Sequence, residues 1–249
     1  MLSRVLLDEK REPIERQRAA EALGAIGNEG ATDALETTLG TRNPRLRQYA
    51  VWALGNIYAK SQDQKKDSFR ETEVSQSLLE QVGRLLADRP SSSSLHYLRG
   101  KLLSTFERYA EAAAELDRAL ALTVEPHGEV YAERASVFVL LGRHADAIRD
   151  YTAAIDRGLS TADVHFRKAV SLGSIGSLSD AAEEFSAALK VDPTFAEALL
   201  ERASVYEKLN QIQSAINDLQ SYIHLKGSGP EAEIAIRRLE QSKNPSKHN

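Results

Sequence analysis

The sequence predicts an all-α protein, a right-handed α-solenoid in which helical hairpins stack into a superhelix. The first reason is a column of small residues that recurs every 34 or 35 positions, namely Gly100, Ala135, Ala169 and Ala203. The second is a separate period of 31 residues within residues 1–60. A unit of either length must stack on its neighbours to bury its apolar side. Aromatic residues form only 6% of the chain, which suits stacked helices better than a β-sandwich.

The second half of the chain, residues 93–227, is predicted to form four hairpins. Their ranges are 93–127, 128–161, 162–195 and 196–227. Two more columns of small residues keep the same register: Ala112, Ala147, Ala181 and Ala215, then Ala119, Ala154 and Ala188. Gly142, Gly176 and Asn210 stand at the predicted turns, where a left-handed backbone ends the first helix. Glu107 occupies that position in the first hairpin, so a less regular turn is expected there.

These hairpins resemble the tetratricopeptide repeat (TPR) family. The small residues match the family's close-contact positions, and large residues match its space-filling positions: Leu103, Phe138, Leu172 and Tyr206 on the first helices, and Leu116, Tyr151, Phe185 and Leu219 on the second. Small side chains allow two helices to approach within about 8–10 Å, and bulky neighbours fill the flanking space. Residues 228–249 are expected to form a capping helix, Glu231–Leu239, and a polar tail.

Residues 1–60 carry a different repeat. The pattern RxxAAEALGAIG returns 31 residues later as RxxAVWALGNIY. Asn43 and Pro44 predict a helix start, as cap and first-turn residue. Thr32–Leu39 predicts the intervening second helix, and Leu2–Leu7 has the pattern of a further second helix. The pattern resembles the short HEAT-like repeats of bilin lyases and related scaffolds. Two units are few for a solenoid, so this segment is expected to depend on packing against the next part of the chain.

Residues 61–92 are predicted to join the two arrays. The charged stretch Lys60–Glu73 contains no aliphatic residue and predicts a loop. The apolar periodicity of Ser75–Asp88 then predicts a junction helix. The serines at 91–94 offer caps for the next helix.

Composition restricts the classes of partner. The net charge of −4 and the isoelectric point near 5.9 give no reason to expect nucleic acid or an anionic membrane. The chain has no cysteine, its first residues do not read as a signal peptide, and no apolar stretch approaches the roughly 20 residues of a membrane span. We therefore expect a cytoplasmic protein without membrane insertion.

Basic residues recur in each hairpin, and each is followed sixteen positions later by an acid. The pairs are Arg99 and Glu115, Arg134 and Asp150, Lys168 and Glu184, and Arg202 and Asp218. One interpretation is an ion pair between the two helices of a hairpin, and the other is a basic stripe for an acidic ligand. Because the acid accompanies the base in every copy, the ion pair is favoured.

No catalytic or cofactor motif is recognised. The six histidines show no metal-ligand spacing, and His96 and His165 occupy equivalent repeat positions, which predicts that they are packing residues. No nucleophile elbow, glycine-rich phosphate loop or HExxH motif is found. The protein is therefore expected not to be an enzyme and to bind no cofactor or metal.

The resemblance implies that the first helices line a concave groove. Helical projection places eleven residues there: Tyr97, Lys101, Ser104, Ala132, Ser136, Val139, Phe166, Val170, Leu200, Ser204 and Glu207. An apolar middle with polar rims suits an extended peptide or an amphipathic helix. The alternative is that this face packs on the junction helix or on a second copy. The family's carboxylate clamp is not expected, because its asparagine position holds Leu98, Glu133, Arg167 and Glu201.

The sequence thus favours a non-enzymatic protein-interaction scaffold, adaptor or assembly factor. One alternative is a bilin-lyase-related enzyme or chaperone that handles a tetrapyrrole through the HEAT-like segment. A second is an RNA-binding α-solenoid, which the acidic isoelectric point and the alanine columns disfavour. The sequence leaves the partner and the oligomeric state open.

Overall fold

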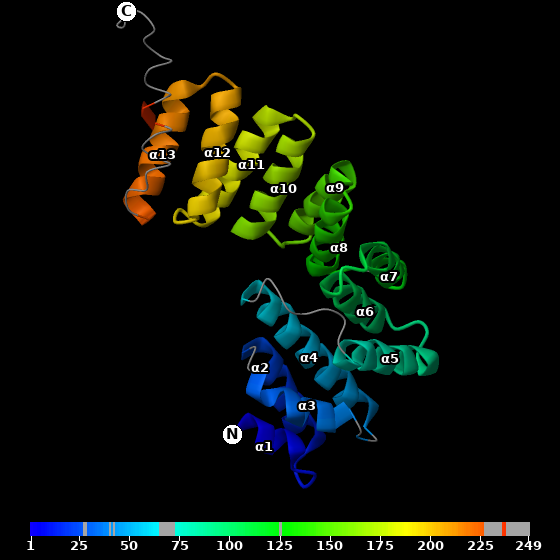
Figure 1. Ribbon diagram of the computed structural model, residues 1–249. Helices are drawn as coiled ribbons and strands as arrows, with labels where there is room; N and C mark the ends of the chain where they lie inside the picture. Colours follow the sequence, from blue (N-terminus) through cyan, green and yellow to red (C-terminus); the bar gives the residue numbers. More distant parts are fainter. Residues whose placement is uncertain are drawn as a thin grey trace, which may run out of the picture. The chain divides into compact units, whose positions relative to one another are not determined.

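The computed structural model describes residues 1–26, 29–39, 41, 43–64, 73–124, 126–226 and 236–237. Across these residues the regular structure is helical, without a β-strand (Figure 1). The chain divides into Met1–Pro126 (unit 1) and His127–Asn249 (unit 2). The all-α, helical-repeat architecture predicted from the sequence is confirmed.

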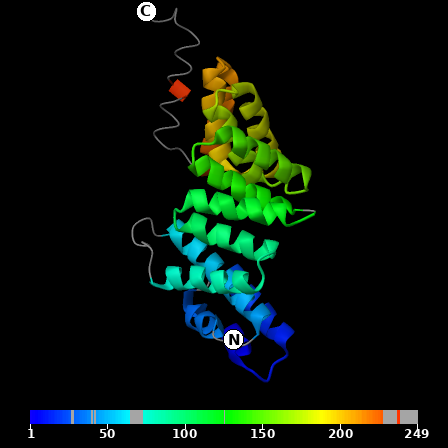
Figure 2. The same ribbon diagram turned by 90° about the vertical axis from the view of Figure 1, so that its right-hand side faces the viewer.

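Unit 1 holds the HEAT-like segment and the first predicted hairpin of the second array. Its described helices are α1 (Leu2–Leu7), α2 (Pro13–Ile26), the 3-10 helix η1 (Glu29–Ala31), α3 (Thr32–Leu39), α4 (Pro44–Gln64), α5 (Glu73–Asp88), α6 (Ser93–Thr105) and α7 (Tyr109–Ala121). Helix α2 packs on α4, while α1 packs on α2 and α3. Helices α5, α6 and α7 come next as layers, each packed on the one before it (Figure 2).

Side-chain caps fix where two of these helices begin. The Asn43 Oδ1 atom accepts hydrogen bonds from the backbone N–H groups of Arg45 and Leu46, at 3.0 and 3.2 Å. At the start of α6, Ser92 Oγ accepts from the N–H of Leu95 at 3.4 Å. Each cap satisfies N–H groups that have no partner within the helix, so both predicted starts are confirmed.

Glycines allow the helices of unit 1 to approach closely. A Cβ on Gly24 of α2 would lie 2.5 Å from the Cα of Ala53 in α4. A Cβ on Gly55 of α4 would lie 3.1 Å from Leu102 Cδ2 in α6. One buried core accordingly extends from Leu6 of α1 to Leu102. The HEAT-like segment therefore packs on the helices after it, as expected.

The loop predicted at Lys60–Glu73 is shorter than the sequence suggested. Helix α4 continues to Gln64, and α5 already begins at Glu73. Residues 60–64 contain neither glycine nor proline, and their polar side chains carry only a small helix penalty, so nothing stops the helix at Lys60. The rest of that predicted loop, 65–72, lies outside the described residues.

Unit 2 contains the three remaining hairpins. Its helices are α8 (Gly128–Leu140), α9 (His144–Asp156), α10 (Ala162–Ser174), α11 (Leu178–Val191), α12 (Ala196–Lys208) and α13 (Ile212–Lys226). The hairpins are α8 with α9, α10 with α11 and α12 with α13, and they stack because α9 packs on α10 and α11 on α12. Every member of the three small-residue columns is buried. Their predicted role as close contacts is therefore confirmed.

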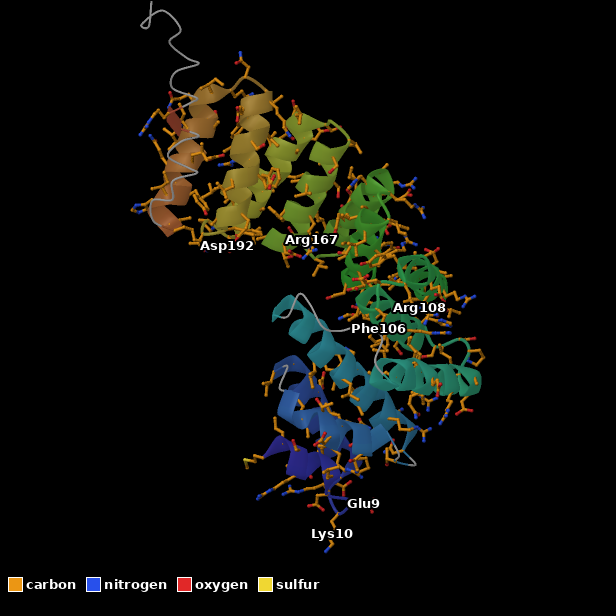
Figure 3. The ribbon with its side chains drawn as sticks, in the orientation of Figure 1. Glu9, Lys10, Phe106, Arg108, Arg167 and Asp192 are labelled. Carbon is orange, nitrogen blue, oxygen red and sulfur yellow. The ribbon has the colours of Figure 1, made fainter. Side chains whose placement is uncertain are left out.

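The hairpin turns share one backbone geometry. Four turn residues have a left-handed backbone, with φ between 58° and 80°: Glu107, Gly142, Gly176 and Asn210. After Glu107, the N–H of Arg108 donates to the Leu103 carbonyl at 2.9 Å, as Arg143 does to Phe138 at 2.8 Å. The expectation of a less regular first turn was wrong, because these backbone hydrogen bonds close the helix whichever side chain is present. Figure 3 marks this turn by Phe106 and Arg108.

The predicted capping helix, Glu231–Leu239, and the polar tail lie outside the described residues except for Ile236 and Arg237. Ile236 packs against the buried cluster between α12 and α13, which includes Ala203 and Leu219. An apolar contact at this point is what a cap on the last hairpin requires.

Candidate protein-binding face

The basic residues of the repeats are paired within their own hairpins. The shortest distances between charged atoms are 3.5 Å for Arg99–Glu115, 2.6 Å for Arg134–Asp150, 2.8 Å for Lys168–Glu184 and 2.7 Å for Arg202–Asp218. The acids are buried or nearly so. The interpretation as ion pairs is therefore confirmed, and this column does not form a stripe of available cations.

Two histidines join these pairs, which the sequence analysis did not foresee. His96 Nδ1 lies 2.7 Å from Glu115 Oε2, and His165 Nδ1 lies 2.7 Å from Glu184 Oε2. On its other side, His96 Nε2 lies 3.0 Å from the carbonyl oxygen of Pro90. Both histidines stand three positions before the basic residue, one helical turn away, and that spacing was the signal available in the sequence.

The acid of the ion pair alternates between glutamate and aspartate from one hairpin to the next. The length of its side chain suits the number of partners that it contacts. Asp150 accepts two hydrogen bonds from Arg134, at 2.6 and 2.7 Å, in the bidentate geometry that an arginine fork allows. Glu115 is one methylene longer and contacts His96 as well as two arginines, Arg99 and Arg118. Hairpins with a histidine therefore carry glutamate, and the others carry aspartate.

The predicted groove residues are divided between the two units. Tyr97, Lys101 and Ser104 lie on α6 in unit 1 and are half-buried. There, Lys101 Nζ donates to Asn56 Oδ1 of α4 at 3.3 Å and lies 6.0 Å from the centre of the Tyr97 ring. Lys101 is thus engaged by α4, a contact that neither the groove prediction nor its alternative, packing on the junction helix or on a second copy, included.

The other eight predicted residues lie on α8, α10 and α12 of unit 2, and we call them the first-helix face. They are Ala132, Ser136, Val139, Phe166, Val170, Leu200, Ser204 and Glu207. Ser204 is exposed and the others are half-buried. Helix α10 contacts both α8 and α12, so the three rows of side chains lie next to each other.

Polar side chains of α8, α9 and α10 influence one another at this face. Ser136 Oγ lies 3.1 Å from the Tyr151 hydroxyl, and burial raises the pKa of Tyr151 despite that hydrogen bond. Arg167 projects from α10 (Figure 3) and donates to Asp163 at 2.8 Å. Burial lowers the pKa of Arg167, but Asp163, with Tyr151 and Glu133 near, raises it overall. The guanidinium therefore stays cationic among these acids.

Phe166 is more than a surface residue. Its ring centre lies 5.6 Å from that of Phe185 on α11 and 4.9 Å from that of Phe195, which precedes α12. Phe166 and Val170 both pack against the buried cluster of the α10–α11 hairpin. Helical projection placed these residues correctly on a half-exposed side, but it could not show the aromatic contacts, because they come from distant positions in the sequence.

Acidic side chains border the first-helix face. They occur three or four positions from its members, on the same side of each helix: Glu129, Glu133, Asp163, Glu197, Glu201 and Glu207. By the same spacing the bases are Arg143, which is paired with Asp146, Arg167, which is paired with Asp163, and Lys208 at the end of α12. The acids at these positions outnumber the bases, which favours a negative potential at the face.

A pocket of about 360 Å³ lies elsewhere in unit 2, between α11 and the end of α12. It is lined by Ser179, Ala182, Glu183, Ser186, Tyr206, Leu209 and Gln211. The four residues of α11 belong to a second helix of a hairpin, so the pocket is not part of the first-helix face. Sequence analysis did not predict it.

Among the side chains that the structure describes, no group of three or more His, Asp or Glu residues is arranged to hold a metal ion. None of the described helices combines the length and the apolar character that crossing a bilayer requires.

Tandem hairpins with small residues at their contacts define a helical-repeat protein, and the family is established by the sequence. The model of the tetratricopeptide repeat matches residues 79–124, 132–185 and 166–233, more than half of the chain. The chain therefore belongs to the tetratricopeptide repeat family. The model of HEAT repeats matches residues 4–84. No curated protein sequence matches the chain.

Solved structures share this fold at low sequence identity. YrrB, described as a TPR protein with an unusual peptide-binding site, has a TM-score of 0.63 and 17% identity over 83% of this chain and 99% of its own. The C-terminal part of a TPR repeat-containing protein from Cytophaga hutchinsonii has a TM-score of 0.64 and 14% identity, over 79% and 72%. MamA has a TM-score of 0.58 and 17% identity, over 72% and 96%.

Proposed function

We propose that the protein is a non-enzymatic interaction scaffold that binds a segment of another protein along the first-helix face of unit 2. One observation carries the proposal: three first helices in register present half-buried apolar and polar side chains in adjacent rows. Such rows suit a bound peptide or helix, whose own side chains are spaced along its length. YrrB, which has the same fold, is described as having a peptide-binding site, and this adds support.

The charge of the face selects the chemistry of the partner. Glu197 and Glu201 are exposed on α12, and Glu129 is exposed on α8. A segment that carries lysine or arginine beside apolar residues would place cations near these carboxylates and apolar groups near Leu200 and Ala132. Complementary charge raises the association rate and disfavours acidic competitors. We therefore propose a basic, partly apolar segment as the partner.

The proposal is tested by selecting peptides of twelve residues from a displayed random library and measuring their affinity by fluorescence anisotropy. The selected peptides are expected to be rich in lysine or arginine. Their affinity should fall at least tenfold when Glu197→Lys and Glu201→Lys are combined, because both changes reverse charge on the face. Affinity should also fall as salt is added.

The matched control combines Asp156→Lys with Asp180→Lys. These exposed acids lie on α9 and α11, second helices, and the double variant has the same net charge as the first. It should bind within twofold of the wild type. Equal loss in both double variants, or selection of neutral peptides that neither variant affects, would overturn the proposal. Circular dichroism checks that both variants remain folded.

Two alternatives considered from the sequence are not proposed. The residues of unit 1 that the structure describes add no support for tetrapyrrole handling, because the match to HEAT repeats indicates a fold and not a ligand. The acidic border of the first-helix face opposes an RNA backbone, because like charges repel.

A further inference from the structure

One residue that lines the pocket between α11 and α12 differs in size from its equivalents in the neighbouring hairpins. The position of Ala182 corresponds to Ile148 in the preceding hairpin and to Ile216 in the following one. Ile148 packs against the buried cluster of the α10–α11 hairpin. At Ala182 the branched side chain is missing, and Ala182 is one of the residues that line the space of about 360 Å³. This volume lies at the lower end of the range of ligand pockets, about 300–1,000 Å³.

The lining combines polar groups, one of them ionised, with a smaller apolar part. Most of the lining is polar, from Ser179, Glu183, Ser186 and Gln211, and the apolar part comes from Leu209, the ring of Tyr206 and the largely buried Ala182. Glu183 is the only charged residue that lines the pocket. Glu183 is exposed to solvent, so its carboxylate is available at the pocket. A long aliphatic side chain with a cationic end therefore fits both parts of the lining.

The nearby arginine does not cancel this preference. Arg202 donates from Nη1 to Ser186 Oγ at 2.8 Å, but its other hydrogen bonds, at 2.8 and 2.7 Å, go to both carboxylate oxygens of Asp218. The charge of Arg202 is therefore balanced within its own hairpin. The Ser186 hydroxyl donates in turn to the Ala182 carbonyl at 2.7 Å, so its proton is already used within the protein. Glu183 is therefore the group that determines the sign of the charge that the pocket favours in a ligand.

We propose that this pocket is a socket for one arginine or lysine side chain of a bound protein. The aliphatic stem packs on Ala182, Leu209 and Tyr206, and the cationic end pairs with Glu183. The socket differs from the first-helix face, because four of its lining residues belong to α11, a second helix, and none of the seven is a member of that face.

The test is NMR titration of the full-length, ¹⁵N-labelled chain with three capped tripeptides, acetyl-Gly-Xaa-Gly-amide, where Xaa is arginine, leucine or glutamate. The arginine peptide should shift the amide signals of the lining residues in a saturable way. The leucine peptide should bind at least fivefold more weakly, and the glutamate peptide should cause no shift there. Equal shifts from all three peptides would overturn the proposal.

Two variants test the geometry. Ala182→Ile places at this position the side chain found at position 148, so it should narrow the socket and weaken binding of the arginine peptide at least threefold. Glu183→Gln should weaken arginine binding at least threefold, whereas Asp180→Asn, on the same helix but outside the lining, should not change it. Unchanged binding in both Ala182→Ile and Glu183→Gln would show that the peptide binds elsewhere. The Glu197→Lys, Glu201→Lys variant of the first-helix face should bind the tripeptide as the wild type does.

Discussion

Arg202 and Asp218 form two hydrogen bonds, 2.8 and 2.7 Å long, that join α12 to α13. The side chain of Asp218 is only 8% exposed, and that of Arg202 is 18% exposed. A carboxylate this buried requires a partner, because its charge has lost most of its hydration. The same arrangement in Arg134 and Asp150 shows that the pair is part of the hairpin design.

Removing Arg202 should therefore destabilise unit 2 strongly. We expect Arg202→Ala to lower the free energy of unfolding by about 3–5 kcal/mol, the usual effect of leaving one member of a buried pair alone. The control is Arg167→Ala, because the Arg167–Asp163 pair is more than half exposed and should contribute less than about 1 kcal/mol. Urea denaturation measures both. Similar losses of unfolding free energy in the two variants would contradict the conclusion that the buried Arg202–Asp218 pair stabilises the protein more than the exposed Arg167–Asp163 pair does.

The ion pairs also predict an acid-sensitive stability. Burial raises the pKa of Glu184, but hydrogen bonds from His165 and Lys168 outweigh it and hold that pKa below its ordinary value. A carboxyl group with a lowered pKa in the folded state stabilises the protein fully above its unfolded-state pKa, about 4.3 for glutamate. That contribution is lost as the pH falls through the folded-state value, since the unfolded chain then binds more protons.

The measurement is the difference in unfolding free energy between wild type and Glu184→Gln, taken at several pH values. The difference should be largest near neutral pH and should shrink as the pH falls below about 4.3. Glu183→Gln, at the exposed neighbouring position, should show no such trend. A difference that stays constant from neutral to acid pH would be incompatible with a lowered pKa of Glu184.

The left-handed backbone of Glu107 predicts a stabilising substitution. A residue with a Cβ loses roughly 1–2 kcal/mol in this conformation, and glycine does not. We expect Glu107→Gly to raise the free energy of unfolding of unit 1 by about 1 kcal/mol, because glycine's greater freedom in the unfolded chain offsets part of the gain. The reverse experiment is Gly142→Ala, at the same turn position of the next hairpin. It should lower the free energy of unfolding by a similar amount. Thermal and urea unfolding report both changes.

Two mid-helix glycines should respond in opposite directions to the same change. Gly24→Ala places a Cβ 2.5 Å from the Cα of Ala53, so α2 and α4 must separate, at a cost of about 1–3 kcal/mol. Gly83 has nothing within 4 Å of its virtual Cβ, and Gly83→Ala should stabilise α5 by about 0.5–1 kcal/mol. If both substitutions raised the melting temperature, the tight α2–α4 contact would be refuted.

The repeats were predictable because their signals are local and periodic. The small columns, the caps at Asn43 and Ser92 and the turns at Gly142 and Gly176 each depend on residues close in sequence. The boundary of α4 was missed because a polar composition does not by itself end a helix. The roles of His96 and Phe166 were missed for another reason: their partners, Glu115 and Phe185, lie 19 residues away and become neighbours only when the hairpin closes.

The two candidate sites differ in how much of each could be predicted from the sequence. Helical projection predicted the residues of the first-helix face because the side of a helix on which a residue lies follows the helical period, and their role in binding stays a prediction. It did not find the socket, because a cavity depends on the summed volume of side chains from α11 and α12. The missing bulk at Ala182 was visible only by comparison with Ile148, and its consequence required the packed structure.

The alternation of Glu115, Asp150, Glu184 and Asp218 divides the hairpins into two kinds. The histidine partners alternate in step with it, as do the residues in the column of Ala113, Ile148, Ala182 and Ile216. In these columns successive hairpins differ and every second one agrees, whereas the basic residues Arg99, Arg134, Lys168 and Arg202 do not alternate. The array therefore alternates between two kinds of internal ion pair, one in which a histidine joins a glutamate and one in which an arginine fork holds an aspartate.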